Sequence, residues 1–397
     1  MIVASEKANQ AVTKRHNARL VFKTIYDHEL ISRAEIARLT NLTATTVSNV
    51  IGELIGEGVV EEVGSVSTER GKPPTLVGLC RDARHVLALN LAQNVFRGGI
   101  FNLRGDLLHQ QCRPAAGLQG EDALKTVQGL VDALLPHTSR PLLGIGVGAP
   151  GLIDAAHGVI NRAVNLRWYD LPLAQLLSER YGLPIHVVND NQASLLAEHL
   201  FGHYRNLANL VVIRVGRGIG AGIMANGQLL QHTGAGEIGH VTVVEQGERC
   251  SCGNDGCLET VASSRAIVER ARNLLADYPH TRLATFVSAR GELDIQAVID
   301  AWRAGDTFLD PIVEDVGRYL GIAIAHLIGI LGSTRVLLCG SVTGFGEPLL
   351  RRIREEVEQR SFTAQLQPPA IDLVSLESDI IMLGATALLL KHELGLF

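Results

Sequence analysis

Four side chains in one short stretch of this sequence have the types and the spacing of a metal site. His240 is followed by Cys250, Cys252 and Cys257, so one imidazole and three thiols lie close together along the chain. These are the donors of a closed tetrahedral zinc site. Gly, Asn and Asp residues around the cysteines favour the tight turns of a metal loop, which makes three unrelated buried thiols a poor alternative. We therefore predict a structural Zn²⁺ bound by these four residues.

Length, charge and composition limit what the rest of the chain does. Its 397 residues are enough for two or three domains. No apolar run reaches the ~18 residues of a membrane span, the N-terminus lacks the layout of a signal peptide, and the other cysteines are scattered, as in a reducing compartment. We expect a cytoplasmic protein without a membrane partner. The net charge of −5 argues against nucleic-acid binding by the whole surface but permits a small DNA-reading domain.

Residues 1–80 predict such a DNA-binding domain. Helical periodicity begins near Asn17, a second helix runs from Ser32 to Thr40 with Ser32 and Glu35 as a capping box, and a third follows from Thr43 to about residue 57. Two short strands, 58–64 and 74–79, enclose a polar tip. This order is typical of a winged helix-turn-helix, whose second motif helix enters the major groove. A helical domain that contacts proteins is the alternative, because acidic and basic residues balance here.

The side chains expected at DNA are short and polar at the start of the third helix, or cationic beside it and in the wing. They are Arg33, Thr43, Thr45, Thr46, Ser48, Asn49, Arg70 and Lys72.

Beyond residue 80 the pattern is α/β. Strand meanders near 86–112 and 210–231 are each followed or preceded by helices, which predicts two related lobes, 81–192 with 380–397 and 193–379. The turn 148–151 and the pair Asn189-Asp190 follow apolar strands, where α/β sheets bind ligands. An apolar helix over 312–331 and a nearly all-apolar helix over 380–390 should be buried.

Ordered motifs along almost the whole chain resemble the ROK family (repressors, open reading frames, kinases). They are the run SRAEIARLTNLTATTVSNVIGELIGEGVVEE with RGKPP, then GVGAPGLID, AVNLRWYDLPL, VVNDNQASLLAEHLFG, VGRGIGAGIMANGQLL, GAGEIGH and CSCGNDGCLE. The resemblance implies a ribonuclease-H-like, actin/hexokinase-type sugar-kinase fold of two lobes around a cleft. The family's repressors usually carry GRPP where this chain has Lys72 in the second position, a change that keeps the charge but loses bidentate geometry.

The same resemblance implies a sugar site. Carboxylates, amides and an imidazole can accept from and donate to vicinal hydroxyls, and the positions that match the family are Asn165, Asn189, Asp190, Glu237, His240 and Glu259. Taken singly, Asp190 could instead cap the following helix, and either glutamate could be solvated. If zinc takes one ring nitrogen of His240, the metal would position three sugar contacts at once.

Kinase activity needs more than this set. Asp190 matches the family's catalytic base, but the family's kinases carry D-x-G-G-T where this chain has the turn from Asn90 to Asn94, without an acid, a glycine or a threonine. Arg217 replaces the usual threonine of the second phosphate loop. We expect that sugar binds and is not phosphorylated.

The resulting hypothesis is a sugar-responsive transcriptional regulator, a repressor of carbohydrate uptake or catabolism genes. As a homodimer or a dimer of dimers it would bind a pseudo-palindromic operator. Two alternatives stay open: an ATP-dependent sugar kinase that carries a DNA-binding domain, and a regulator controlled by a protein partner that docks on the zinc-bearing lobe.

Overall fold

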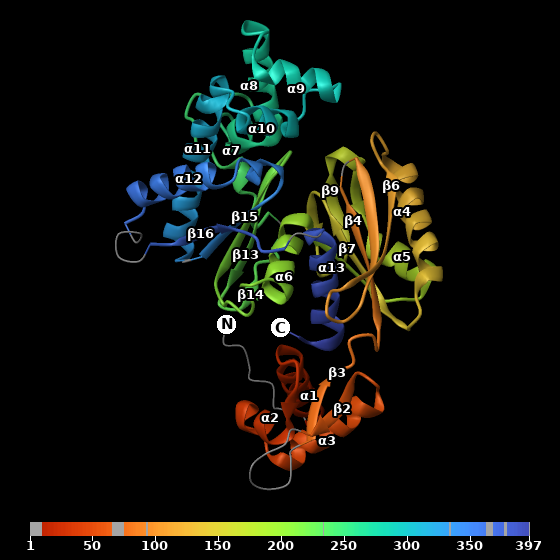
Figure 1. Ribbon diagram of the computed structural model, residues 1–397. Coiled ribbons are helices and arrows are strands. Elements are labelled where there is room, and N and C mark those ends of the chain that lie inside the picture. Colours follow the sequence, from red (N-terminus) through yellow and green to blue (C-terminus); the bar gives the residue numbers. More distant parts are fainter. Residues whose placement is uncertain are drawn as a thin grey trace, which may run out of the picture. The chain divides into compact units, whose positions relative to one another are not determined.

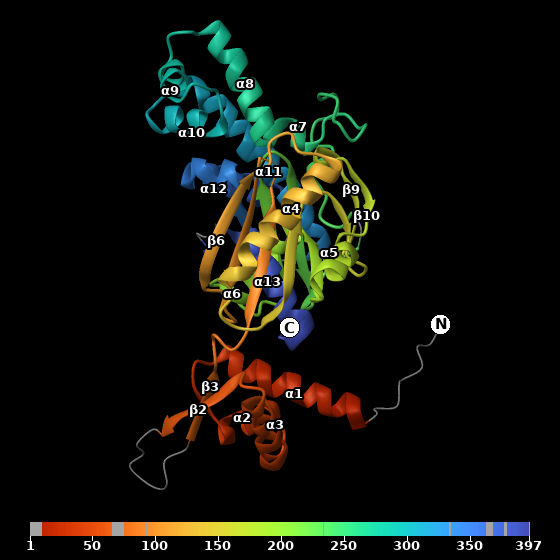
Figure 2. The same ribbon diagram turned by 90° about the vertical axis from the view of Figure 1, so that its right-hand side faces the viewer.

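The computed structural model describes residues 10–65, 75–92, 94–232, 234–332, 335–362, 368–376 and 379–396. The chain divides into two compact units, which Figures 1 and 2 show from two sides. The first unit comprises residues 1–151, 155–188 and 385–397, and the second comprises residues 152–154 and 189–384. In the described part of the chain, no helix is long and apolar enough to cross a membrane.

The first unit begins with a small head of three helices and a three-stranded antiparallel sheet of order β1-β3-β2. Its elements are α1 (Gln10–Asp27), β1 (Ile31–Ser32), α2 (Arg33–Thr40), α3 (Ala44–Gly56), β2 (Val60–Ser65) and β3 (Thr75–Leu79). The three predicted helices and two predicted strands form, but the first helix begins at Gln10 rather than near Asn17, and β1 was not expected.

The predicted cap of α2 forms only in part. The Ser32 hydroxyl accepts a hydrogen bond from the Glu35 amide at 3.2 Å. The Glu35 carboxylate, however, pairs with Arg38 of its own helix, so the reciprocal half of the capping box is wrong. Between α2 and α3, Asn41 adopts a left-handed φ of 54°, which makes the turn short.

The body of the first unit is a five-stranded sheet of order β11-β7-β4-β5-β6. β4, β5 and β6 form the predicted antiparallel meander, and β7 lies parallel to β4. The helix α4 packs on β5 and β6 (Figure 2). The strands and helices of this body are β4 (His85–Leu91), β5 (Val95–Phe101), β6 (Leu107–Pro114), α4 (Gly120–Leu134), β7 (Leu142–Ala149), β9 (Val159–Ala163), β10 (Trp168–Leu171), α5 (Leu173–Tyr181) and β11 (Ile185–Asn189). The β9–β10 hairpin was not predicted.

The second unit has a sheet of order β14-β13-β12-β15-β16, in which β12, β15 and β16 run parallel. Its core lies between this sheet and the helices α11 and α12. Its elements include β8 (Leu152–Asp154), α6 (Asp190–Phe201), β12 (Leu210–Val215), β13 (Ile219–Ala225), β14 (Gln228–Leu229), α7 (Leu258–Ala262), α8 (Ser264–Asp277), α9 (Arg282–Arg290), α10 (Ile295–Arg303), α11 (Asp310–Leu331), β15 (Arg335–Cys339), α12 (Glu347–Arg360) and β16 (Ala370–Leu373). The sequence reading did not anticipate α8, α9 and α10.

The last helix, α13 (Ile380–Leu389), is buried as predicted and continues into the π-helical turn η7 (Leu390–Leu394). Within the second unit, Gly384 lies so close to α6 that a Cβ there would meet the Ala193 carbonyl oxygen. Within the first unit, Gly146 of β7 makes an equally close approach to the Ala385 carbonyl. The glycines therefore allow an apolar helix to touch neighbouring backbone directly.

Candidate functional site

The predicted metal ligands come together in the second unit. His240 ends the short helix η3 (Ile238–His240), and Cys257 is the N-cap residue of α7. The four ligand atoms all lie within 4.8 Å of one another. The Nδ1 atom of His240 is 3.6 Å from the Sγ of Cys250, and the Sγ atoms of Cys252 and Cys257 are 3.6 Å apart.

These separations fit a single tetrahedral ion. Zinc bonds of about 2.0 to 2.3 Å place neighbouring ligand atoms about 3.5 to 3.8 Å apart. The loop that carries the cysteines is fixed by its own backbone, since the Cys250 amide donates to Asn254 at 2.8 Å and the Gly253 amide donates to Cys250 at 3.0 Å. Gly253 and Gly256 adopt φ values of 104° and 67°, which favour glycine. The cluster is thus a closed set of four donors, all from the protein.

Two thiols of the cluster differ in their electrostatic surroundings. Burial raises the pKa of the Cys257 thiol well above its ordinary range, whereas a backbone hydrogen bond from Asn254 lowers that of Cys252. A bound cation would reverse the effect of burial on Cys257, because a coordinated thiol is held as thiolate. Metal affinity should therefore depend on pH, with protons released on binding.

Three carboxylates predicted to hold sugar lie near this cluster. Burial raises the pKa of the Glu237 carboxyl, with the charge of His240 lowering it and those of Asp190 and Glu259 raising it further. The Nε2 atom of His240 is 4.0 Å from the Glu237 carboxylate, so the imidazole turns Nδ1 to the cysteines and Nε2 to the carboxylate side. The structure thus brings together Asp190, Glu237, His240 and Glu259.

The start of α6 differs from the expected one. The helix begins at Asp190, and its N-cap is Asn189, whose side-chain oxygen accepts from the Asn191 amide at 2.9 Å. The interpretation of Asp190 as the helix cap is therefore wrong. Its carboxylate instead pairs with Arg214 at 3.2 Å.

Arg214 pairs with a predicted sugar contact and was not among the predicted site residues. It lies on β12, and its side chain and that of Asp190 are 28% and 19% exposed. One cation near the end of an otherwise apolar strand, LVVIRV, was the available signal. Because the pair lies where sugar is expected, Arg214 orients the Asp190 carboxylate and offers further donors to a ligand.

The carboxylate of Glu259, from α7, lies against residues 216–220, which were expected to match a second phosphate loop. This carboxylate accepts from the Ile219 amide at 3.2 Å, and Arg265 lies 4.0 Å from its other oxygen. Gly218 leaves room for this carboxylate, since a Cβ there would be 2.9 Å from the Glu259 Oε2 atom. Arg217 is exposed. A backbone amide that could meet a phosphate is thus already bonded to a carboxylate.

The remaining predicted positions lie in the first unit. Asn165 is half-buried in the short helix η2 (Val164–Leu166). Asn90 is buried at 3% exposure within β4, and Asn94 is exposed directly before β5. Gln93, between them, lies outside the described residues.

The predicted DNA contacts differ in their exposure and in their hydrogen bonds within the head. Thr43 is the N-cap residue of α3 and accepts from the Thr46 amide at 3.2 Å. Thr45 and Asn49 are exposed one turn apart on α3, and Thr46 and Ser48 are half-buried. The guanidinium of Arg33 is held by Glu62 at 2.8 Å and by the Ser48 carbonyl at 3.4 Å. Arg70 and Lys72 lie outside the described residues.

Comparison with known proteins places this architecture in context. The model of the ROK family matches residues 86–392. A xylose repressor of Caldicellulosiruptor bescii is 32% identical over 396 residues, which cover 98% of each chain. The DNA-binding transcriptional dual regulator NagC of Escherichia coli strain K12 is 29% identical over 90% of this chain and 88% of its own.

Solved structures give the same picture. A ROK family transcriptional regulator, described as a homologue of the E. coli MLC protein, aligns with a TM-score of 0.84 at 27% identity, covering 97% of this chain and 98% of its own. A ROK family glucokinase from Streptomyces griseus, solved with glucose and AMPPNP, aligns with a TM-score of 0.68 at 24% identity over 77% of this chain and 98% of its own. The glucokinase comparison shows the shared fold alone.

Proposed function

Because this chain belongs to the ROK family, we propose that it is a sugar-responsive transcriptional repressor. The observation that carries the proposal is the share of this chain that each relative matches. The regulators match the chain nearly end to end, whereas the glucokinase structure is almost fully aligned yet covers 77% of this chain. This difference in coverage supports a segment of the chain that the regulators share and that the glucokinase does not match.

We assign the head of the first unit to DNA binding. The head is a winged helix-turn-helix in which α3 enters the major groove by its first turns. The exposed Thr45 and Asn49 are suited to base edges, while Thr43 and Arg33, already engaged within the head, set the position of α3. The operator is pseudo-palindromic and the protein is a homodimer or a dimer of dimers, since symmetric half-sites need symmetric heads.

The effector is a neutral sugar held beside the metal loop. Asp190, Glu237 and Glu259 accept from hydroxyls, and the amides of Asn189 and Asn165 can donate. One of the relatives is named a xylose repressor, and xylose is a neutral sugar with vicinal hydroxyls of this kind. A structural Zn²⁺ on His240, Cys250, Cys252 and Cys257 fixes one ring nitrogen and leaves Nε2 to face the ligand.

The chain is not an enzyme in this proposal. Two features support it: Asp190 is paired with Arg214 rather than standing free as a base, and the amide of Ile219 is bonded to Glu259 rather than available to a phosphate. Asn90 is a buried strand residue at the position where the kinases of the family carry an acid.

Operator binding tests the proposal. The purified protein selects its site from a random duplex pool, and fluorescence anisotropy then measures the affinity with and without millimolar xylose, N-acetylglucosamine or glucose. We expect one sugar to change the operator Kd by about ten-fold or more. Equal affinity with every sugar would reject the effector role and favour a protein partner as the regulator. Sugar-dependent ADP release above background in a coupled assay would reject the non-enzymatic assignment.

A further inference from the structure

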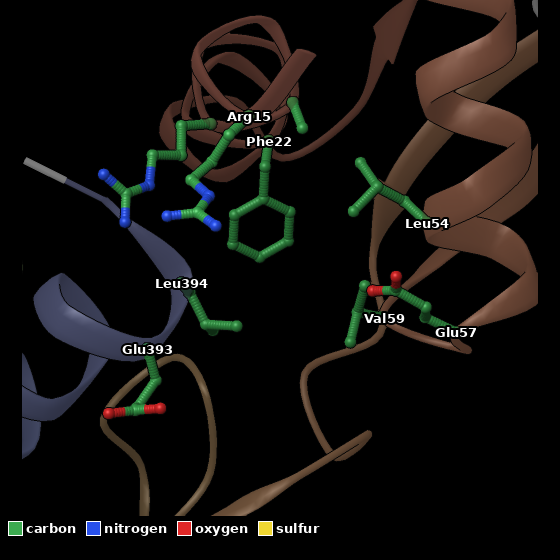
Figure 3. A pocket seen from close by; sticks show the side chains of 9 residues that line it. Arg15, Phe22, Leu54, Glu57, Val59, Glu393 and Leu394 are labelled. Carbon is green, nitrogen blue, oxygen red and sulfur yellow. The ribbon is translucent and has the colours of Figure 1, made fainter. Parts of the chain in front are cut away.

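The helix α1 meets the body of the first unit at two places with different characters. At its C-terminal end it is bonded tightly to the turn between β5 and β6. In its N-terminal half it faces the C-terminal turn η7 across a cavity, which Figure 3 shows from close by. A helix that is hydrogen-bonded at one end and borders a cavity at the other can tilt about its bonded end.

Several hydrogen bonds fix the C-terminal end of α1. The Tyr26 hydroxyl donates to the Leu103 carbonyl at 2.9 Å, and Tyr26 itself is 4% exposed. Arg104 donates back to the carbonyls of Tyr26 at 2.5 Å and His28 at 3.3 Å, and its guanidinium lies over the Tyr26 ring at 4.6 Å. These bonds reach the last turn of α1, where helix carbonyls have no partner of their own.

The N-terminal half of α1 borders a cavity of about 350 Å³. Apolar side chains and charged side chains of both signs line it, as Figure 3 shows for the labelled residues. The lining residues are Arg15, Ala18, Arg19 and Phe22 of α1, Leu54 and Glu57 at the end of α3, Val59, and Glu393 and Leu394 of η7. Space of this size between two elements lets one move against the other without breaking a packed core.

A close contact joins α1 to the segment that follows η7. Gly395 follows η7 with a φ of 68°, and a Cβ placed there would lie 2.5 Å from the Nε atom of Arg19. The side chain of Arg19 therefore rests directly on the backbone of Gly395. Any shift of the C-terminal turn moves the surface on which Arg19 lies.

The C-terminal turn η7 contacts β11, the strand that leads to the predicted sugar contacts Asn189 and Asp190. His186 of β11 contacts the Glu393 carboxylate at 2.8 Å and stacks on His392 with ring centroids 4.4 Å apart. Three residues after His186, the same strand ends at Asn189, and Asp190 follows. Covalent continuity thus joins the expected sugar contacts to the turn on which Arg19 rests.

We propose that the contacts His186–Glu393 and Gly395–Arg19 form a latch that transmits sugar binding to the DNA-reading head. The inference rests on the proposed function and adds its route. The hydrogen bonds of Arg104 fix the C-terminal end of α1, and the cavity gives its N-terminal half room to move. The latch sets the orientation of the half that carries Arg15 and Arg19. Sugar on Asn189 and Asp190 displaces β11, and the latch converts that displacement into a tilt of α1. Two arrangements of the latch would make the two states that a ligand can select.

The test measures coupling rather than binding. The coupling ratio is the operator Kd with sugar divided by that without it, for wild type and for Glu393→Gln, His186→Asn and Arg19→Gln. Direct titration gives the Kd of the sugar for each protein. We expect the three variants to move the ratio toward one by about five-fold or more, with the sugar Kd within about two-fold of wild type. His186→Asn combined with Glu393→Gln should do no more than either alone, since both break one contact.

Arg15→Gln is the matched control. It removes the same charge from the same helix, one turn earlier, at the same cavity but away from Gly395. It should keep the wild-type ratio, and hydrogen exchange of residues 10–20 should change with sugar in wild type and in this control but not in Glu393→Gln.

The outcomes separate the two proposals. A wild type whose operator affinity ignores every sugar would overturn the proposed function, and the latch with it. Wild-type ratios in the latch variants of a responsive protein would overturn the latch alone. An equal loss in Arg15→Gln would show an effect of α1 charge and would likewise overturn it.

Discussion

At the scale of single residues, the carboxylates of the candidate site differ in the groups that they contact. Asp190 meets Arg214, Glu259 meets the Ile219 amide with Arg265 nearby, and Glu237 is left with His240. Burial raises the pKa of the Glu237 carboxyl, because the compensation that His240 offers is smaller than the cost of desolvation. A sugar hydroxyl that donates to Glu237 would supply part of that compensation.

Cys252→Ser tests the metal ligands. A serine hydroxyl is a poor zinc ligand, so we expect the zinc content to fall from about one ion per chain to near zero and the free energy of unfolding to drop by more than about 2 kcal/mol. Elemental analysis and thermal unfolding measure the two effects. Cys112→Ser, at an exposed thiol outside the cluster, should change neither. Retained zinc in Cys252→Ser would contradict the four-ligand site.

At the scale of elements, the second unit depends on close helix packing. Along α11, Gly317 and Gly321 lie one turn apart and face α12, where added Cβ atoms would meet Arg352 and Glu356. The Glu356 carboxylate is buried at 2% exposure and is paired with Arg352 and Arg360. The two glycines thus let α12 approach α11 closely while this buried charge keeps its partners.

Gly321→Leu should disrupt that packing. A Cβ at this position would lie 2.5 Å from the Glu356 Cβ and 3.1 Å from the Ile353 carbonyl oxygen, so we expect a loss of about 1–3 kcal/mol from overpacking. Gly329→Ala, on the same helix with no described atom within 4 Å of the new Cβ, should instead stabilise by about 0.5–1 kcal/mol. Thermal or urea unfolding compares the two, and equal effects would exclude close helix contact as the cause.

At the scale of the whole molecule, sugar binding is linked to stability. A ligand that binds the folded state at about 100 times its Kd stabilises it by about 2.7 kcal/mol. We expect the effector sugar to raise the melting temperature of wild type more than that of Asp190→Asn, because the amide oxygen still accepts from a hydroxyl but lacks the charge of the carboxylate and its ion pair with Arg214. Sugar alcohols at equal concentration control for unspecific solvent effects. A rise in Asp190→Asn equal to that in wild type would remove Asp190 from the site.

Many features of this protein could be predicted from local pattern. The His240, Cys250, Cys252 and Cys257 cluster was evident from residue types and spacing, and the head, the meanders and the buried helices α11 and α13 followed from hydrophobic periodicity and turn residues. These features depend on neighbours in the chain, and secondary structure and metal loops respond to such neighbours first.

Tertiary structure decided the rest. Nothing local indicates that Arg214 pairs with Asp190, that Asn189 rather than Asp190 caps α6, or that Gly395 supports Arg19 from the other end of the chain. These contacts join residues far apart in sequence or depend on backbone geometry at a strand end. Their partners are selected by packing, because a charge or a glycine is compatible with many neighbours until the fold chooses one.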